Sequence, residues 1–217
     1  MPSTSTSLRR AALLVVVASL AGPAVVFLDA ALHGPSTWAS AAAFVAGHRP
    51  LQALPPLLGF PLLLGFVLFV SAARRLDAER GHRVDQGPVF LLTAIYGALV
   101  AVNYVSNGMW AHQAGSEELG AVAAFSMNNP RALTWSFELA GYGLLGAVTW
   151  LVAPTFREEP WIAWLLRANG VVSVGSAAWA AVDQTWVLAP AGLVFYAAWN
   201  LLVVVLMALV ARRFREA

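Results

Sequence analysis

Three carboxylates interrupt long apolar segments of this chain: Asp29, Glu138 and Asp183. An ionisable group inside such a segment is costly in a membrane, so each of them is a candidate for function. A carboxyl that burial keeps protonated can donate its proton to an alkene or an epoxide, and a carboxylate can remove a proton. These residue types therefore favour general acid–base chemistry on a hydrophobic molecule.

Aromatic and amide side chains accompany the carboxylates at helical spacings. Residues three, four or seven positions apart share one face of a helix. Four faces combine a polar group with aromatic rings in this way: Asn103, Asn107 and Trp110; Trp135, Glu138 and Tyr142; Trp179, Asp183 and Trp186; and Tyr196 and Asn200. Because ring faces attract positive charge, such a site can stabilise a carbocation or bind an ammonium group.

This chemistry assigns an expected role to each residue. We expect Glu138 to be the acid and either Asp183 or Asp29 to be the base. Aromatic and amide residues are expected to bind the substrate, with Tyr142, Trp179 and Trp186 stabilising the cation. The full set of substrate-binding candidates is Asn103, Asn107, Trp135, Tyr142, Trp179, Trp186, Tyr196 and Asn200.

Each candidate also has a structural interpretation. Tryptophan gathers at membrane interfaces, and asparagine inside a span commonly bonds a neighbouring helix. His33 follows Asp29 by one helical turn and could bond to it. Arg131 precedes Glu138 by two turns on the same face, which allows an interfacial ion pair.

The composition indicates what kind of element positions these residues. Of 217 residues, 59% are hydrophobic and only 11% are charged, and the mean hydropathy is +0.70. A soluble domain carries about a quarter charged residues, so a soluble globule is excluded. Cysteine and lysine are absent, which excludes thiolate metal sites and Schiff-base cofactors. The histidines lack the spacing of a metal site, and we expect neither a metal nor a cofactor.

Six segments are long and apolar enough to cross a membrane as helices, over about 11–32, 51–73, 88–110, 132–153, 162–189 and 190–211. Arginine indicates their orientation, because cytoplasmic segments are enriched in positive charge. Only Arg49 and Arg131 of the thirteen arginines fall on the far side, which predicts that both termini are cytoplasmic. The expected fold is a single all-α integral membrane domain, a bundle of six transmembrane helices with an aromatic and carboxylate pocket in its outer half.

A second interpretation of the N-terminus stays open. Arg9 and Arg10, followed by the apolar residues 11–20, resemble a secretory signal. Its cleavage would remove about the first 31 residues and leave five spans. The apolar run continues to Leu28 without a clear cleavage site, which favours six spans.

The connecting segments carry local signals. Residues 74–87 read as a charged cytoplasmic loop, a solvated anchor beside anionic lipid headgroups. Residues 36–47 and 117–125 predict short interfacial helices on the outer side. Asn129 and Pro130 are typical of the cap and the first position of a helix, here the fourth span.

Two features of the spans leave alternatives open. Pro55, Pro56 and Pro61 disturb the second span, either because its backbone borders a cavity or because the helix kinks in packing. Three plus three spans suit an inverted repeat. However, Asp29 comes late in the first span and Glu138 early in the fourth, so the sequence itself indicates no repeat.

Two classes of function fit these observations. The first is a membrane-embedded enzyme for an isoprenoid or sterol-like lipid, of the terpene cyclase or isomerase type, an analogy of chemistry and size only. The second is a proton-coupled carrier or receptor for a hydrophobic cation, which protonation of Glu138 would release; a non-catalytic accessory protein is the third alternative. A carrier needs access from both sides, and the inner half offers no matching polar residues, which favours the enzyme.

The expected partner is a membrane lipid or a hydrophobic small molecule. The net charge of +2 does not indicate nucleic acid, because a membrane protein places its arginines for a topological reason. The lysine-free, alanine-rich composition suggests a bacterial inner membrane as the location.

Overall fold

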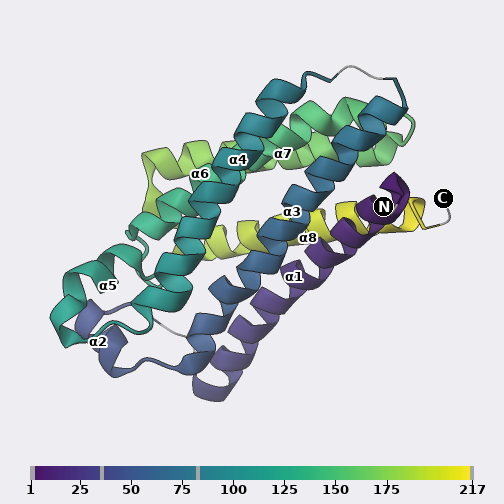
Figure 1. Cartoon of the computed structure of the whole chain (residues 1–217). Helices are drawn as coiled ribbons and strands as arrows, with labels where there is room; N and C mark the ends of the chain where they lie inside the picture. The colour runs from purple at the N-terminus through teal and green to yellow at the C-terminus, as the bar shows by residue number, and fades with distance from the viewer. Residues whose placement is uncertain (1–2, 35–36, 82–83, 216–217) are drawn as a thin grey trace.

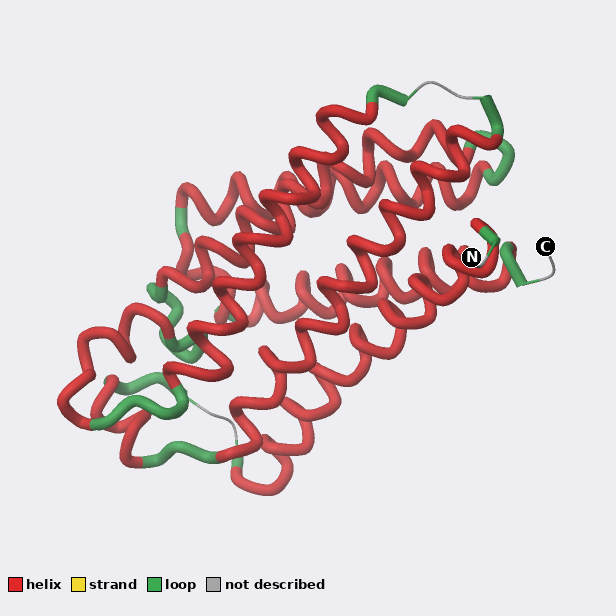
Figure 2. The backbone as a smooth tube through the Cα atoms, viewed as in Figure 1, coloured by secondary structure: helices red, strands yellow, loops and turns green. Residues whose placement is uncertain are grey.

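The computed structural model describes residues 3–34, 37–81 and 84–215, and within these residues every regular element is a helix (Figures 1 and 2). Ser36 and Arg83, which entered the sequence predictions, lie outside the described residues. Six helices are long and apolar enough to span a membrane: α1 (Thr4–His33), α3 (Leu54–Glu79), α4 (Gln86–Tyr104), α6 (Leu133–Val152), α7 (Pro160–Val182) and α8 (Pro190–Arg213). The prediction of an all-α chain with six such helices is confirmed.

Shorter helical segments connect the long helices: α2 (Ala41–Ala46), η1 (Pro50–Ala53), the π-helical η2 (Val105–Ala111), η3 (Ser116–Glu118), α5 (Leu119–Phe125), η4 (Ala153–Phe156) and η5 (Gln184–Leu188). The elements α2 and α5 fall within the two predicted short helices and pack on each other. They lie at the end of the bundle opposite the two chain termini (Figure 1). The end with the termini also carries most of the arginines, and we call it the arginine-rich end.

Two predicted helix boundaries are wrong. In both cases a short polar side chain accepts a backbone hydrogen bond where the helix was expected to continue. The fifth span ends at Val182 rather than at residue 189, because Asp183 caps η5 instead of continuing α7. The fourth span begins at Leu133, not at Pro130. Asn129 forms a turn there: its Oδ1 accepts from the Arg131 backbone N–H at 3.1 Å. Side chains of this kind compete with the helix for backbone hydrogen bonds.

The six long helices form a closed ring whose packing repeats after three helices. The most extensive contacts join α1 to α3 and α6 to α7, followed by those of α4 with α6 and of α8 with α1. The helices of the pairs α3–α4 and α7–α8 pack on each other much less extensively. The ring therefore divides into a first group (α1, α3, α8) and a second group (α4, α6, α7), which meet along a seam (Figure 1). This repeat in the packing was not evident in the sequence.

Small residues allow helices to approach closely within each group. A Cβ added to Gly65 of α3 would lie 2.7 Å from Val15 Cγ2 of α1. A Cβ added to Gly146 of α6 would lie 2.7 Å from Ser173 Cβ and 3.0 Å from the Gly170 carbonyl oxygen of α7. Such stripes of small residues are how membrane helices pack closely.

Large apolar side chains face outward as well as inward. Phe66, Phe69 and Phe156 are fully buried in the core. Phe27 and Leu201, by contrast, are 75% and 64% exposed, as expected for surfaces that meet lipid rather than water. This outer surface agrees with six helices that are long and apolar enough to cross a membrane, the arrangement of a multi-pass membrane protein.

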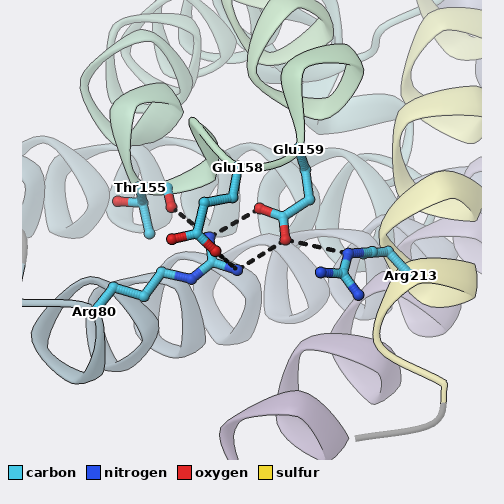
Figure 3. Close-up of polar contacts among 5 residues, drawn as sticks. All are labelled: Arg80, Thr155, Glu158, Glu159 and Arg213. Carbon is cyan, nitrogen blue, oxygen red and sulfur yellow. Dashed lines mark hydrogen bonds and ion pairs between the residues drawn. The ribbon is translucent and has the colours of Figure 1, made fainter.

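A charged network closes the seam at the arginine-rich end (Figure 3). Arg80, which follows α3, donates from Nη1 and Nη2 to the two Glu159 carboxylate oxygens, each at 2.8 Å. Arg213 of α8 donates from Nε to Glu159 Oε1 at 3.2 Å. Burial alone would raise the pKa of Glu159, but the hydrogen bond from Arg80 and the two arginine charges outweigh it and leave the pKa below its ordinary value. Glu159, between α6 and α7, thus binds two helices of the first group, α3 through Arg80 and α8 through Arg213.

The segment 74–87 is only partly the solvated loop that its charge predicted. The helix α3 continues through it to Glu79. Asp77 is buried, and its carboxylate accepts from the Val84 backbone N–H and from Gln86 Nε2, each at 3.2 Å. It also accepts from Thr155 Oγ1 at 3.2 Å, which adds a second polar contact across the seam.

Candidate functional site

Glu138 lies in the second turn of α6, toward the end of the bundle that carries α2 and α5. The side-chain amide of Asn103 donates to Glu138 Oε2 at 2.5 Å. The Tyr104 hydroxyl donates to Glu138 Oε1 at 3.4 Å. Both partners come from α4, which packs extensively on α6 within the second group. The carboxyl is therefore held at both oxygens by a neighbouring helix.

Tyrosine rings surround this carboxyl. The hydroxyls of Tyr104 and Tyr142 lie 2.9 Å apart and share a hydrogen bond. The ring of Tyr142 meets Tyr96 edge-on, with centroids 5.6 Å apart, and meets Trp199 edge-on at 5.0 Å. Tyr96, Tyr104 and Tyr142 are all buried. Two linked phenol groups, Tyr104 and Tyr142, thus lead from Glu138 to Trp199.

Trp199 of α8 carries the network across the seam from the first group to the second. Its indole Nε1 donates to Asn169 Oδ1 and to Ser173 Oγ, each at 3.1 Å. Asn169 in turn donates from Nδ2 to Thr149 Oγ1 at 3.1 Å. These bonds fix the indole where α7 and α8 otherwise make few contacts.

Tyr196 is the most accessible ring at this site. It lies one turn before Trp199 and stacks on it, with centroids 6.4 Å apart and an interplanar angle of 27°. Tyr196 is 50% exposed, whereas Trp199 is 8% exposed. We call the whole set the Glu138 cluster: Tyr96, Asn103, Tyr104, Glu138, Tyr142, Tyr196 and Trp199.

The sequence of α3 leaves room for Tyr104. A Cβ at Gly59 would overlap the Tyr104 ring, and Phe60 meets the same ring edge-on at 5.6 Å. Pro55 and Pro56 lie in the first turn of α3, where a proline costs no hydrogen bond. Of the three prolines that were predicted to disturb this span, only Pro61 lies beyond the first turn, in the interior of the helix.

Asn107 and Trp135 hold the segment that enters α6. Asn107 Oδ1 accepts from the Met127 backbone N–H at 3.1 Å, and Trp135 Nε1 donates to the Met127 carbonyl oxygen at 2.9 Å. The Met127 sulfur lies 3.7 Å from Asn103 Nδ2. The structure therefore places Asn107 and Trp135 beside the Glu138 cluster, where they position Met127 against it.

Asp183, Trp179 and Trp186 do not share one helical face, because α7 ends before Asp183. The Asp183 carboxylate is exposed and accepts from the Thr185 backbone N–H at 2.9 Å and from its hydroxyl at 2.6 Å. Those hydrogen bonds, with a smaller contribution from the Arg131 charge, lower the pKa of Asp183. Trp179 is 63% exposed, and Trp186 packs edge-on against Phe195. Within the described residues, none of these three side chains forms a hydrogen bond or an ion pair with Glu138.

Asp29 and Asn200 have local partners. Asp29 is buried and accepts from His33 Nδ1 at 3.0 Å, with Arg49 Nη1 at 3.5 Å. The expected bond between Asp29 and His33 is therefore present. Asn200 donates to the Tyr196 carbonyl oxygen, one turn back in its own helix. Neither side chain bonds to Glu138.

Several members of the cluster were not singled out from the sequence. Tyr96 lies seven residues before Asn103, a spacing that would have assigned it to the same face. Tyr104 and Trp199 are chain neighbours of Asn103 and Asn200, and spacing rules assign adjacent residues to different faces. Asn169, which lies outside the cluster but bonds to Trp199, carried no such signal either, because Trp199 belongs to another helix.

The described residues contain no group of three or more histidine, aspartate or glutamate side chains that could hold a metal ion. No family model, curated protein or solved structure matches this chain. The site is therefore interpreted from its own geometry.

Proposed function

We propose that this chain is a membrane-embedded isomerase or cyclase for a neutral, hydrophobic lipid of isoprenoid or sterol-like character, with Glu138 as the proton donor. The observation that carries the proposal is the way Glu138 is held. Asn103 and Tyr104 fix its two oxygens, Tyr142 bonds to Tyr104, and the ring of Trp199 lies against that of Tyr142.

Glu138 alone supplies the acid and the base in this proposal, since neither Asp29 nor Asp183 contacts it. The carboxyl proton adds to one carbon of a double bond and leaves a carbocation on the other. The Glu138 carboxylate then removes a proton from a neighbouring carbon, and the double bond has moved. In a cyclase, a second double bond attacks the cation before that proton leaves. Substrate and product have the same formula, so no co-reactant is needed.

The aromatic members of the cluster support this chemistry. Ring quadrupoles attract positive charge, so Trp199, Tyr142 and Tyr196 would stabilise the intermediate cation. Tyr196 is half-exposed and is the ring that a lipid entering along the seam would meet first. We also propose that the substrate pocket expected from the sequence lies in this half of the bundle, beside the Glu138 cluster.

A location in a bacterial inner membrane with cytoplasmic termini is part of the same proposal. The two chain ends lie together at the arginine-rich end, which agrees with the enrichment of cytoplasmic segments in positive charge. The Glu138 cluster then lies in the outer half. The Glu159 network closes the seam on the cytoplasmic side, which favours an enzyme over a carrier that needs access from both sides.

A receptor for a hydrophobic cation is the second candidate. Within the described residues Glu138 takes part in no ion pair, so its carboxylate next to aromatic rings has no cation of its own. That arrangement also suits an ammonium group.

Isotope transfer tests the proposed chemistry. Lipids that purify with the protein are identified by mass spectrometry and then incubated with it in D₂O. An isomerase of this type exchanges the Glu138 proton with solvent and places one deuterium on the product at the carbon that it protonates. Asp183→Asn is the matched control, because it removes a carboxylate outside the cluster and keeps a capping side chain. Deuterium transfer that persists in Glu138→Gln would contradict the assignment.

A further inference from the structure

A second site lies at the arginine-rich end, far from Glu138. A hollow of about 600 Å³ opens between the last turns of α3 and the start of α4. Its lining residues are Ser71, Arg74, Arg75, Asp77, Ala78, Val84 and Gln86. It belongs neither to the Glu138 cluster nor to the Glu159 network.

The charges of this hollow suit an anion. Arg74 donates from Nε to Gln86 Oε1 at 2.6 Å, and its guanidinium lies 5.9 Å from the centre of the Phe90 ring. Arg75 is the adjacent, exposed cation. Asp77 supplies the only carboxylate of the lining, and both its oxygens already accept hydrogen bonds. The lining therefore has a net positive charge that its own carboxylate does not cancel.

An apolar stripe leads along α3 to the hollow. Leu64, Leu68, Ser71 and Arg75 follow one another at spacings of four, three and four residues, so they share one helical face. Leu64 and Leu68 are exposed, and Phe90 is exposed on the facing helix α4. The surface changes from apolar to cationic where a membrane span reaches its polar interface. A molecule that matches it has a hydrocarbon chain and an anionic head.

We propose that this hollow binds the phosphodiester headgroup of an anionic phospholipid, with an acyl chain along Leu64 and Leu68. Guanidinium groups are suited to phosphate because their N–H fork can donate two parallel hydrogen bonds to its oxygens. Arg74, which Gln86 already orients, and Arg75 supply the two guanidinium groups that bind the phosphate. Ser71 lies at the level where the headgroup meets the chain.

Native mass spectrometry of the full chain tests this site. The purified protein is titrated with phosphatidylglycerol and, separately, with phosphatidylcholine of the same acyl chains. We expect phosphatidylglycerol to be retained selectively, and Arg74→Gln/Arg75→Gln to weaken its binding by about tenfold or more. The matched control is Arg157→Gln/Arg167→Gln, which removes the same charge from exposed positions outside the hollow and should bind as the wild type does.

A second variant covers the case in which the double variant folds poorly. Ser71→Glu puts a negative charge in the hollow without removing an arginine, and it should weaken phosphatidylglycerol binding as well. Equal binding of the two lipids, or an equal loss in the Arg157/Arg167 control, would overturn the site. Binding of inorganic phosphate without selective retention of phosphatidylglycerol would also overturn it, because it would show that free phosphate, not a lipid, is the ligand.

Discussion

The backbone of Gly59 in α3 lies so close to the ring of Tyr104 in α4 that a Cβ at position 59 would overlap the ring. Tyr104 is the residue whose hydroxyl contacts both the Glu138 carboxyl, at 3.4 Å, and the Tyr142 hydroxyl, at 2.9 Å. A glycine of the first helix group thus fixes the centre of a hydrogen-bond network that belongs to the second group.

Gly59→Ala therefore tests the network without removing any of its polar atoms. The added methyl group must displace the Tyr104 ring, and overpacking of this kind costs about 1–3 kcal/mol. We expect a lower melting temperature and a lower turnover of the co-purified lipid.

The control for that variant is Gly97→Ala in α4, where an added Cβ meets no atom within 4 Å. Its melting temperature and turnover should match those of the wild type. Equal behaviour of the two alanine variants would mean that the approach of Gly59 to Tyr104 is not important for the site.

The Glu159 network should stabilise the seam. Glu159→Gln keeps the shape of the side chain but removes the charge that Arg80 and Arg213 share, and we expect a loss of about 1–3 kcal/mol in thermal unfolding. Glu158→Gln is the matched control, because Glu158 is 57% exposed and lies 3.5 Å from Arg80. An exposed pair contributes less than about 1 kcal/mol. A control variant that loses as much as Glu159→Gln would refute the network.

The same network predicts an acid limit. The folded state lowers the pKa of Glu159 below its ordinary value of 4.5, so the stabilisation is present above pH 4.5 and is lost as the pH falls through the folded pKa. The melting temperatures of the wild type and of Glu159→Gln should therefore converge below pH 4.5. A difference between them that stays constant down to pH 3 would contradict this.

His112 and His48 predict a separate effect at milder pH. Their Nδ1 atoms lie 3.0 Å apart, so one ring donates to the other and at least one must be neutral. Burial, followed by the charge of His48, lowers the pKa of His112 from 6.5 to about 4. The unfolded chain takes up this proton below pH 6.5 and the folded chain does not, so stability should fall from pH 7 to pH 5.

The measurement for the histidine pair is the melting temperature at both pH values, in the wild type and in His112→Gln. The variant should lose the part of the pH dependence that His112 causes. A wild-type melting temperature that rises toward pH 5, or a variant with the same pH dependence as the wild type, would show that the pair is not the cause.

Spacing along the sequence predicted the helical faces well where the helix continued. Asn103, Glu138 and Tyr142 were assigned to facing stripes; in the structure Asn103 bonds directly to Glu138, and Tyr104 links Glu138 to Tyr142. The same rule failed for Asp183, because the spacing assumed a helix that the Asp183 side chain itself ends. Periodicity describes positions on a helix, and it does not show where a capping group competes with that helix.

Contacts between segments far apart in the chain could not be predicted from the sequence, for a different reason. Arg80 and Glu159 are 79 positions apart, and each lies just outside an apolar span, where a charge is unremarkable. Their pairing depends on which helices become neighbours. The Trp199 indole and Asn169 meet for the same reason, because the ring of helices closes between α7 and α8. A single sequence contains no signal for that closure.

The most direct test of the central claim is the turnover of the co-purified lipid by Glu138→Gln. The glutamine keeps the size of the side chain and can still bond to Asn103 and Tyr104, but it has no proton to transfer. We predict unchanged lipid binding, a similar melting temperature and a fall in turnover on the order of 10² or more. Weaker binding of lipophilic ammonium compounds would instead identify a cation receptor. Full turnover in this variant would contradict the role of Glu138 as the proton donor.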